Sequence, residues 1–394
     1  MINVLLIATY DSFLKAGLSV AHNIENADID VYIHKVCKQQ LSKKQIHDAG
    51  LQANKIQYFY ISDIFKIPDF LEKYQIIILS AGNGVCYRFF KEYHQHFLNK
   101  AQRPIVIGVF PGVIFGDTAS INARLNSDIL LCYSTNDTQI ATQLAALNNN
   151  HVDIINYGLP SERLSVNTQA VDNIYFIDQV RIPYRYEERE YVINQLIKLA
   201  QKYPDRTVYI KTRIAKNEKT VHQDKFSYQS ILHKHNPLPS NLKIIHEDIR
   251  DSIRKMDICL SFSSTVSFEA IQHNIPSFVI SDFGIAKEYE NITFLGSDIL
   301  INFNQFIENI DNLPQINQVW KESNLHITNE KYQLNKSINL ALSNIVPYKP
   351  EDILCGRAFY CKSTLSFKSR FIRKTKKFFR NPSQFFIDSK LFEK

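Results

Sequence analysis

Short, almost continuous apolar runs alternate with amphipathic stretches along the chain. The first run covers residues 2–8, and an amphipathic stretch over residues 13–24 follows it. Such a run is typical of a strand buried on both faces of a parallel sheet, while apolar residues every three or four positions predict a helix. The same alternation predicts further strands at residues 29–34, 57–61, 76–80, 105–110 and 128–132.

The alternation restarts after the turn at residues 157–160. It predicts a helix over residues 186–202, a second helix over 264–273, and strands at residues 173–178, 207–211, 242–246, 257–261, 277–281 and 292–295. Strands that alternate with helices predict a doubly wound parallel sheet. We therefore expect two Rossmann-like lobes, an N-terminal acceptor-binding lobe over residues 1–165 and a C-terminal nucleotide-sugar-binding lobe over residues 166–350. Residues 351–394 would be a separate tail.

Composition agrees with a two-domain globular protein. The 394 residues are 45% hydrophobic and 22% charged, and a chain of this length exceeds one ordinary core. The six cysteines are scattered without a four-ligand zinc spacing, so we expect reduced thiols and a cytoplasmic location. No apolar run approaches the roughly 20 residues that span a bilayer, and no secretory signal is expected.

The strongest candidate site lies where the predicted strand at 257–261 ends. Ser263, Ser264 and Thr265 lead into a helix that carries Glu269. Hydroxyls and N–H groups at a helix N-terminus bind phosphate, and a carboxylate one turn further could accept bonds from a ribose. The alternative is ordinary N-capping with a first-turn glutamate.

Two other strand ends of the predicted C-terminal lobe carry polar residues. Lys211 and Arg213 end one strand and could neutralise a diphosphate, with His222 beyond them as a catalytic or phosphate-contacting group. Asp178 and Gln179 end the first strand of this lobe. A solvated strand end and a turn into a helix are the respective alternatives.

In the predicted N-terminal lobe, Asp11 and Ser12 follow the first strand. A carboxylate there could act as general base toward an acceptor hydroxyl, or it could cap the first helix. Further loops at strand ends are expected to shape the acceptor side through Gly82, Asn83, Pro111 and Gly112.

At these residues the chain resembles a bacterial family of surface-polysaccharide glycosyltransferases. The resemblance spans most of residues 1–300 and rests on ATYDSFLK (8–15), FIDQ with RIPY (176–184), IKTR with Glu218 and His222, and SSTVSFEA (263–270). The Ser-Ser-Thr element is also similar to that of GT-B sialyltransferases and Kdo transferases, where it contacts the phosphate of a CMP-activated sugar. Those sialyltransferases usually carry a His-Pro pair on the preceding strand end, where this chain has Lys211-Thr212-Arg213.

The resemblance implies a GT-B enzyme that needs no metal and no cofactor beyond its nucleotide-sugar co-substrate. It implies that Ser263, Ser264 and Thr265 hold phosphate, and we expect inverting transfer with Asp11 as base. The expected donor is a nonulosonic acid on CMP (sialic, legionaminic or pseudaminic acid) or Kdo, and the acceptor a capsule, O-antigen or lipooligosaccharide glycan. A UDP-sugar transferase and a non-catalytic membrane-associated scaffold are the alternatives.

The basic charge is confined to the tail. The net charge is +7, and residues 351–394 alone hold eleven Lys/Arg against four Asp/Glu, which is also +7. The tail resembles the ends of several capsule and lipooligosaccharide transferases, and it predicts a helix on the anionic inner face of the membrane or one docked on the N-terminal lobe. Since the body is neutral, no nucleic-acid partner is expected. The predicted membrane residues are Arg373, Lys374, Lys376, Lys377, Phe378 and Phe379.

Overall fold

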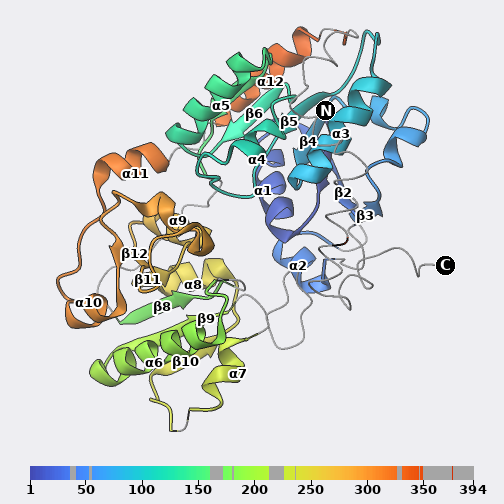
Figure 1. Cartoon of the computed structure of the whole chain (residues 1–394). Coiled ribbons are helices and arrows are strands. Elements are labelled where there is room, and N and C mark those ends of the chain that lie inside the picture. Colours follow the sequence, from blue (N-terminus) through green and yellow to red (C-terminus); the bar gives the residue numbers. More distant parts are fainter. Residues whose placement is uncertain are drawn as a thin grey trace. The chain divides into compact units, whose positions relative to one another are not determined.

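The structure, a computed structural model, describes residues 1–35, 41–52, 56–159, 172–179, 182–212, 226–235, 237–325, 331–345, 347–348 and 375. These residues form two compact α/β units, whose elements are labelled in Figure 1. The first unit comprises Met1–Cys132, Thr138–Ile155 and the described residues from Lys331 onward, and the second comprises Tyr133–Asp137 and Asn156–Glu330.

The first unit is built on a seven-stranded sheet with the order β3-β2-β1-β4-β5-β6-β7. Its central strands pair in parallel, with Val4 opposite Ile76 and Ile76 opposite Ile105. The strands are β1 (Ile2–Ala8), β2 (Ala27–His34), β3 (Ile56–Phe59), β4 (Ile76–Ser80), β5 (Ile105–Gly108), β6 (Ile129–Cys132) and β7 (Asp153–Asn156). The helices between them are α1 (Asp11–Ala21), α2 (Lys43–Asp48), α3 (Asn83–His96), α4 (Thr118–Asn122) and α5 (Thr135–Leu147), with short 3₁₀ turns η2 (Ile64–Lys66) and η3 (Leu71–Lys73).

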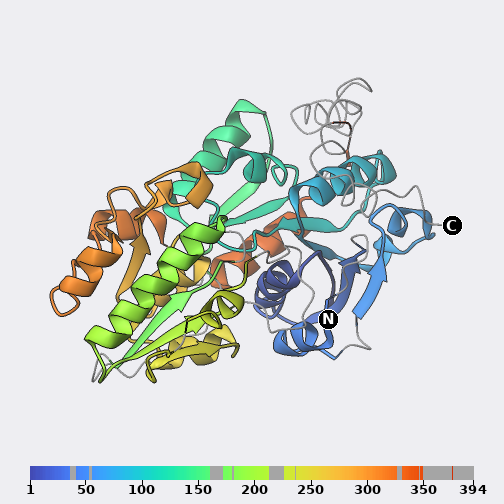
Figure 2. The same cartoon turned by 60° about the horizontal axis from the view of Figure 1, so that its bottom comes forward.

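The second unit holds a six-stranded parallel sheet with the order β10-β9-β8-β11-β12-β13. Figure 2 shows the long helix α6 lying along the strands of this sheet. The strands are β8 (Asn173–Ile177), β9 (Thr207–Lys211), β10 (Leu242–Ile245), β11 (Ile258–Ser261), β12 (Ser277–Ile280) and β13 (Leu300–Ile301). The helices are α6 (Tyr186–Lys202), α7 (Tyr228–Leu232), α8 (Ile249–Lys255), α9 (Thr265–Gln272), η4 (Lys287–Tyr289), η5 (Ile292–Phe294), α10 (Phe303–Glu308) and α11 (Gln318–Asn324).

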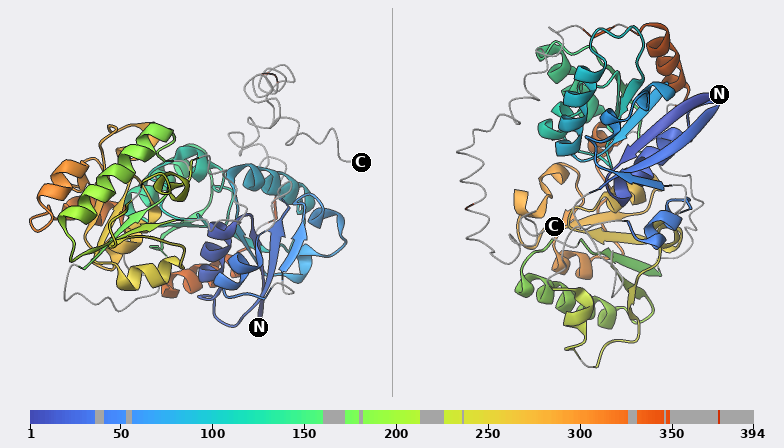
Figure 3. Two further views of the ribbon diagram at one scale, coloured as in Figure 1. Left: turned by 90° about the horizontal axis from the view of Figure 1, so that it is seen from below. Right: turned by 90° about the vertical axis from the view of Figure 1, so that its right-hand side faces the viewer.

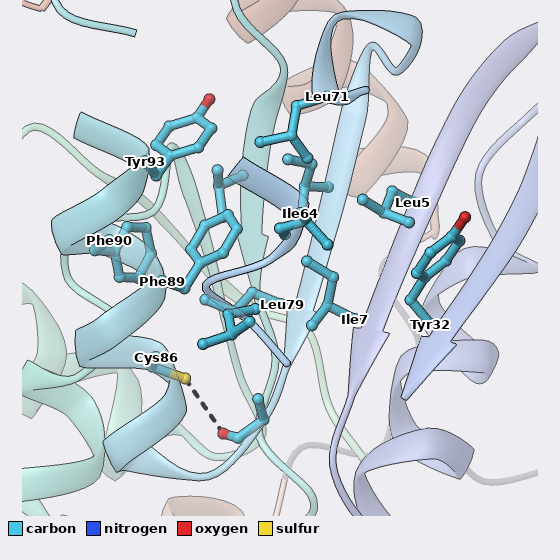
Figure 4. Close-up of a cluster of buried hydrophobic side chains, with 14 of the residues drawn as sticks. Leu5, Ile7, Tyr32, Ile64, Leu71, Leu79, Cys86, Phe89, Phe90 and Tyr93 are labelled. Carbon is cyan, nitrogen blue, oxygen red and sulfur yellow. Dashed lines mark hydrogen bonds between the residues drawn. The ribbon is translucent and has the colours of Figure 1, made fainter. Parts of the chain in front are cut away.

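A large aromatic and aliphatic cluster forms one side of the first unit. Figure 4 shows Phe89, Phe90 and Tyr93 of α3 facing Leu5, Ile7 and Leu79 of the sheet, and all six are at most 1% exposed. Burying such side chains contributes roughly 1.5–3 kcal/mol each. The thiol of Cys86 donates to the carbonyl of Ala81 in the same region, at 3.3 Å. The strand runs predicted from hydrophobicity are therefore the core of the unit.

The chain returns to the first unit at its C-terminal end. Helix α12 (Lys331–Ser343) contacts β5, and the side chain of Asn335 accepts from the backbone N–H of Glu25 and donates to the carbonyl of Asn23. The right-hand view of Figure 3 shows this helix, in red-brown, beside the strands of the first unit. The sequence-based division at 166–350 had placed these residues in the second unit, and the tertiary contacts of Asn335 place them in the first.

One predicted strand is wrong. Residues 292–295 were expected to extend the second sheet, but Ile292–Phe294 form a 3₁₀ turn and the last strand is Leu300–Ile301. The turn is held by the indole N–H of Trp320, which donates to the carbonyl of Thr293 at 3.0 Å. Strand β7 was not predicted. Within the part of the chain that the structure describes, no helix is long and apolar enough to cross a membrane.

Candidate functional site

The Ser-Ser-Thr element lies at the carboxyl end of β11, a central strand of the second sheet. Helix α9 begins at Thr265, and Ser264 is its N-cap residue because its hydroxyl accepts from the backbone N–H of Val266 at 3.2 Å. Ser263 and Ser264 are largely buried, whereas Thr265 is exposed. Ser264 thus has the helix-capping role that was the alternative interpretation, and phosphate binding stays a prediction.

Ser261, the last residue of β11, fixes the shape of this turn. Its buried hydroxyl lies 2.7 Å from the hydroxyl of Ser267 and accepts from the backbone N–H of Ser264 at 3.3 Å. The pair ties the last residue of β11 to the first turns of α9.

Gln179 joins the end of β8 to the Ser-Ser-Thr turn. Its side-chain oxygen accepts from the backbone N–H of Ser263 at 2.8 Å, and its side-chain nitrogen donates to the hydroxyl of Ser263 at 3.0 Å. The two predicted donor-site residues Gln179 and Ser263 are therefore brought together by the neighbouring strands β8 and β11.

Asp178 lies beside a buried arginine. Its carboxylate lies 3.7 Å from the guanidinium of Arg189 on α6, and both side chains are 2% exposed. Arg189 also donates to the backbone carbonyls of Gln179, Pro183 and Phe226. This placement favours a positioning role for Asp178 over direct contact with a ligand.

Lys211 ends β9 beside β8, as the sequence predicts. Its ammonium donates to the backbone carbonyl of Thr212 at 2.9 Å, and the side chain is 9% exposed. The hydroxyl of Thr212 lies 2.5 Å from the imidazole of His246, which follows β10. His246 is a polar strand-end residue that the sequence reading missed, although its position after residues 242–245 follows the same rule.

Aromatic side chains pack around Phe262, which lies within this turn. The ring of Phe262 stacks on Phe283 with centroids 5.7 Å apart and planes at 13°. Tyr289 lies against the ring of Phe283, and its hydroxyl donates to the carboxylate of Glu188 at 2.8 Å. Burial and that carboxylate raise the pKa of Tyr289 to about 12, so its phenol is neutral near pH 7. Glu269, half-buried on α9, lies one turn beyond Thr265.

The first unit presents its own group of strand-end residues. Asp11 and Ser12 are the first residues of α1, which follows β1 after Thr9 and Tyr10. The N-cap residue is Tyr10, so the alternative that Asp11 or Ser12 caps this helix is wrong. The backbone N–H of Gly82 donates to the hydroxyl of Thr9 at 3.3 Å, which ties the end of β4 to the end of β1. Asp11 and Gly82, each predicted to follow a strand end, thus follow neighbouring strands.

A buried arginine that was not predicted organises the loops after β4 and β5. Arg124 is 1% exposed, and it donates to the carbonyls of Ala81, Val109 and Ser120 and to the side chain of Asn83. Asn83 in turn donates to the hydroxyl of Ser120 at 3.1 Å. In the next loop Pro111 is exposed and Gly112 is buried. Arg124 therefore fixes the loops that carry the predicted acceptor-side residues.

Several predicted residues lie outside the described residues. These are Arg213, Glu218, His222 and the tail residues Arg373, Lys374, Lys376, Lys377, Phe378 and Phe379. Their roles stay predictions. Within the described ranges, no group of three or more His, Cys, Asp or Glu side chains is arranged to hold a metal ion.

Solved structures similar to this chain have its fold. The "putative UDP-N-acetylglucosamine 2-epimerase" of Listeria monocytogenes is 10% identical with a TM-score of 0.60, over 88% of this chain and 98% of that chain. The UDP co-structure of S. aureus MnaA is 12% identical with a TM-score of 0.57, over 89% and 99%. Methanocaldococcus jannaschii UDP-GlcNAc 2-epimerase in complex with UDP-GlcNAc and UDP is 12% identical with a TM-score of 0.54, over 87% and 100%.

The predicted fold class, two Rossmann-like α/β domains of the GT-B type, is confirmed by this likeness. A search among curated proteins finds no similar sequence. The model of the family described as "Putative glycosyltransferase (DUF6716)" matches residues 4–339. Since that match covers most of the chain and both α/β units, the chain belongs to this glycosyltransferase family.

Proposed function

We propose that the chain transfers a glycosyl unit from a nucleotide-sugar whose phosphate binds at Ser263, Ser264 and Thr265. The observation that carries this proposal is the direction of the hydrogen bonds in the turn. The hydroxyls of Ser263 and Ser264 each accept a bond from a protein N–H. A hydroxyl has one proton, and acceptance leaves that proton to be donated. Two such hydroxyls at a helix N-terminus favour an anionic ligand.

The ends of the neighbouring strands add charge and shape to this donor site. The ammonium of Lys211 ends β9, next to β8, and would offset the negative charge of a leaving nucleotide. Glu269 on α9 would accept from ribose hydroxyls. Arg213 and His222 are proposed to complete the site from the segment after β9.

We propose a UDP-linked sugar as the donor. Solved structures of similar fold were obtained with UDP or UDP-GlcNAc, and the ligand of those proteins supports the same nucleotide here. A CMP-linked nonulosonic acid or Kdo is the second candidate, supported by the resemblance of the Ser-Ser-Thr element. Transfer would be inverting and independent of metal, with Asp11 as base and Ser12, Gly82, Asn83, Pro111 and Gly112 around a surface-glycan acceptor.

Ligand binding tests the donor. Thermal melts of the chain with UDP, UDP-GlcNAc, CMP and CMP-sialic acid should show stabilisation by one nucleotide family, because a ligand at 100 times its Kd stabilises by about 2.7 kcal/mol. Ser264→Ala should weaken that stabilisation, whereas Ser230→Ala, an exposed serine of α7, should not. If only CMP compounds stabilise the chain, UDP is excluded as the donor nucleotide. If no nucleotide stabilises it and the tail binds lipid, a non-catalytic scaffold is favoured.

Product analysis tests the reaction. With UDP-GlcNAc and a lipooligosaccharide acceptor extract, transfer would release UDP in equal amount to the glycosylated acceptor, and EDTA would leave the rate unchanged. Conversion of the sugar nucleotide into its 2-epimer without acceptor would contradict the proposal and would indicate an epimerase on this fold.

A further inference from the structure

The side-chain amide of Gln179 has only one possible orientation. The backbone N–H of Ser263 can only donate, so the atom 2.8 Å from it must be the amide oxygen. The amide NH₂ group then necessarily faces the hydroxyl of Ser263, at 3.0 Å. Both distances are those of good hydrogen bonds. Gln179 and Ser263 therefore form a closed two-bond pair with a fixed direction.

This direction decides what the hydroxyl of Ser263 offers to a ligand. An NH₂ group cannot accept, so the Ser263 oxygen accepts from Gln179 and its proton remains to be donated elsewhere. The residue Ser263 is 7% exposed, so few water molecules can compete for its hydroxyl. A group that accepts strongly, such as a phosphate oxygen, matches this hydroxyl.

Gln179 is itself held by a rigid support. Its backbone carbonyl accepts from the guanidinium of Arg189 at 3.1 Å and from the backbone N–H of Ile182 at 2.8 Å. The preceding backbone N–H, of Asp178, donates to the carbonyl of Lys211 on β9 at 2.9 Å. The strand end that carries Gln179 is thus fixed on both sides, which a pre-organised binding site needs.

We propose that Gln179 is a positioning residue of the donor site, acting through Ser263 rather than touching the nucleotide-sugar. It keeps the Ser263 hydroxyl oriented as a hydrogen-bond donor to the phosphate. This inference rests on the proposed function, because it assigns the ligand of Ser263 as the donor phosphate.

A double-mutant cycle on the full chain tests the inference, with the Kd of UDP measured by calorimetry. Ser263→Ala removes a charge-assisted bond and should raise the Kd about tenfold, and Gln179→Met should raise it about fivefold. If Gln179 acts through the hydroxyl, the double variant should bind like Ser263→Ala alone, because interacting residues are not additive. Gln318→Met, an exposed glutamine of α11, is the matched control and should bind like the wild type.

The two other outcomes overturn the inference in different ways. A roughly fiftyfold rise in the double variant, the product of the single effects, would mean that Gln179 contacts the ligand independently. Failure of the wild type to bind UDP or CMP would remove the proposed donor site together with the inference.

Thermal melts of each variant without ligand identify any loss of folding, and Gln179→Glu is the second variant if Gln179→Met does not fold. Its carboxylate would accept a hydrogen bond from the Ser263 hydroxyl, which would turn that hydroxyl away from the phosphate, and it should weaken UDP binding more than Gln179→Met.

Discussion

The carboxylate of Asp178 and the guanidinium of Arg189 lie 3.7 Å apart, and each side chain is 2% exposed. Removing one member of such a buried pair leaves the other charge without compensation, which costs about 3–5 kcal/mol. Arg189→Met should therefore lower the free energy of unfolding by about that amount in urea titrations. The surface pair of Arg254 and Asp251 is the control. Its two side chains are about half exposed, so Arg254→Met should cost under about 1 kcal/mol. Equal losses in both variants would contradict the structural role of Arg189.

Asp11 is the proposed general base. Asp11→Asn keeps the size of the side chain and removes its basicity, so turnover should fall at least about a hundredfold while the Kd of the donor stays unchanged. Steady-state transfer and nucleotide binding measure the two quantities separately. Asp63→Asn, a partly exposed aspartate of the same unit, should retain full turnover. Near-normal turnover by Asp11→Asn would remove Asp11 from that role.

Gly17 allows α1 to pack closely on β1. A Cβ atom at this position would lie 2.4 Å from Leu6 Cδ1 and 3.1 Å from the Cβ of Ser80. Gly17→Ala should therefore destabilise the first unit by about 1–3 kcal/mol through overpacking. At Gly84, in the first turn of α3, a Cβ would meet nothing within 4 Å, so Gly84→Ala should be neutral or stabilise by about 0.5–1 kcal/mol. Thermal melts of the two variants should move in opposite directions, and a stabilised Gly17→Ala would contradict the packing.

His34 should make stability depend on pH. Burial, with the charge of Arg88, lowers the pKa of its imidazole below 6.5, and its Nδ1 accepts from the backbone N–H of Ile61 at 3.1 Å. The contribution of neutral His34 to the free energy of unfolding is complete above pH 6.5. It is lost as the pH falls through the lowered pKa of the folded state, because the unfolded chain then binds the proton more readily. The Tm should fall between pH 7 and pH 5, and less so in His34→Gln. His47→Gln, at a side chain 90% exposed, should follow the wild type.

Strand positions could be predicted because the sequence of a buried parallel strand is a continuous run of apolar residues. Residues 2–8 and 76–80 correspond closely to β1 and β4, which pair in the centre of the first sheet. The Ser-Ser-Thr turn could be placed for the same reason, since its strand and helix have clear patterns. The four residues 292–295, three apolar and one threonine, were too few to distinguish a strand from a turn, and the contact with Trp320 decided it.

The supports behind the site could not be predicted. Arg189 lies in a segment with an ordinary helical pattern and Arg124 in the turn after α4, and burial of an arginine follows from which carbonyls converge on it in three dimensions. The pairing of Gln179 with Ser263 joins positions 84 residues apart. Local patterns therefore identify which strand ends carry polar groups, while the direction of each hydrogen bond requires the structure.

The return of α12 to the first unit has a consequence for the order of events during synthesis. Residues 1–155 leave the ribosome first, yet the Asn335 side chain that bonds to Glu25 and Asn23 is made more than 300 residues later. Domains generally fold as units as they emerge. The second unit is complete at Glu330, so all of it is synthesised before the first unit receives α12. The unit whose first residues are translated before those of the other is thus the last to be finished, and a truncation before Lys331 would leave it without α12.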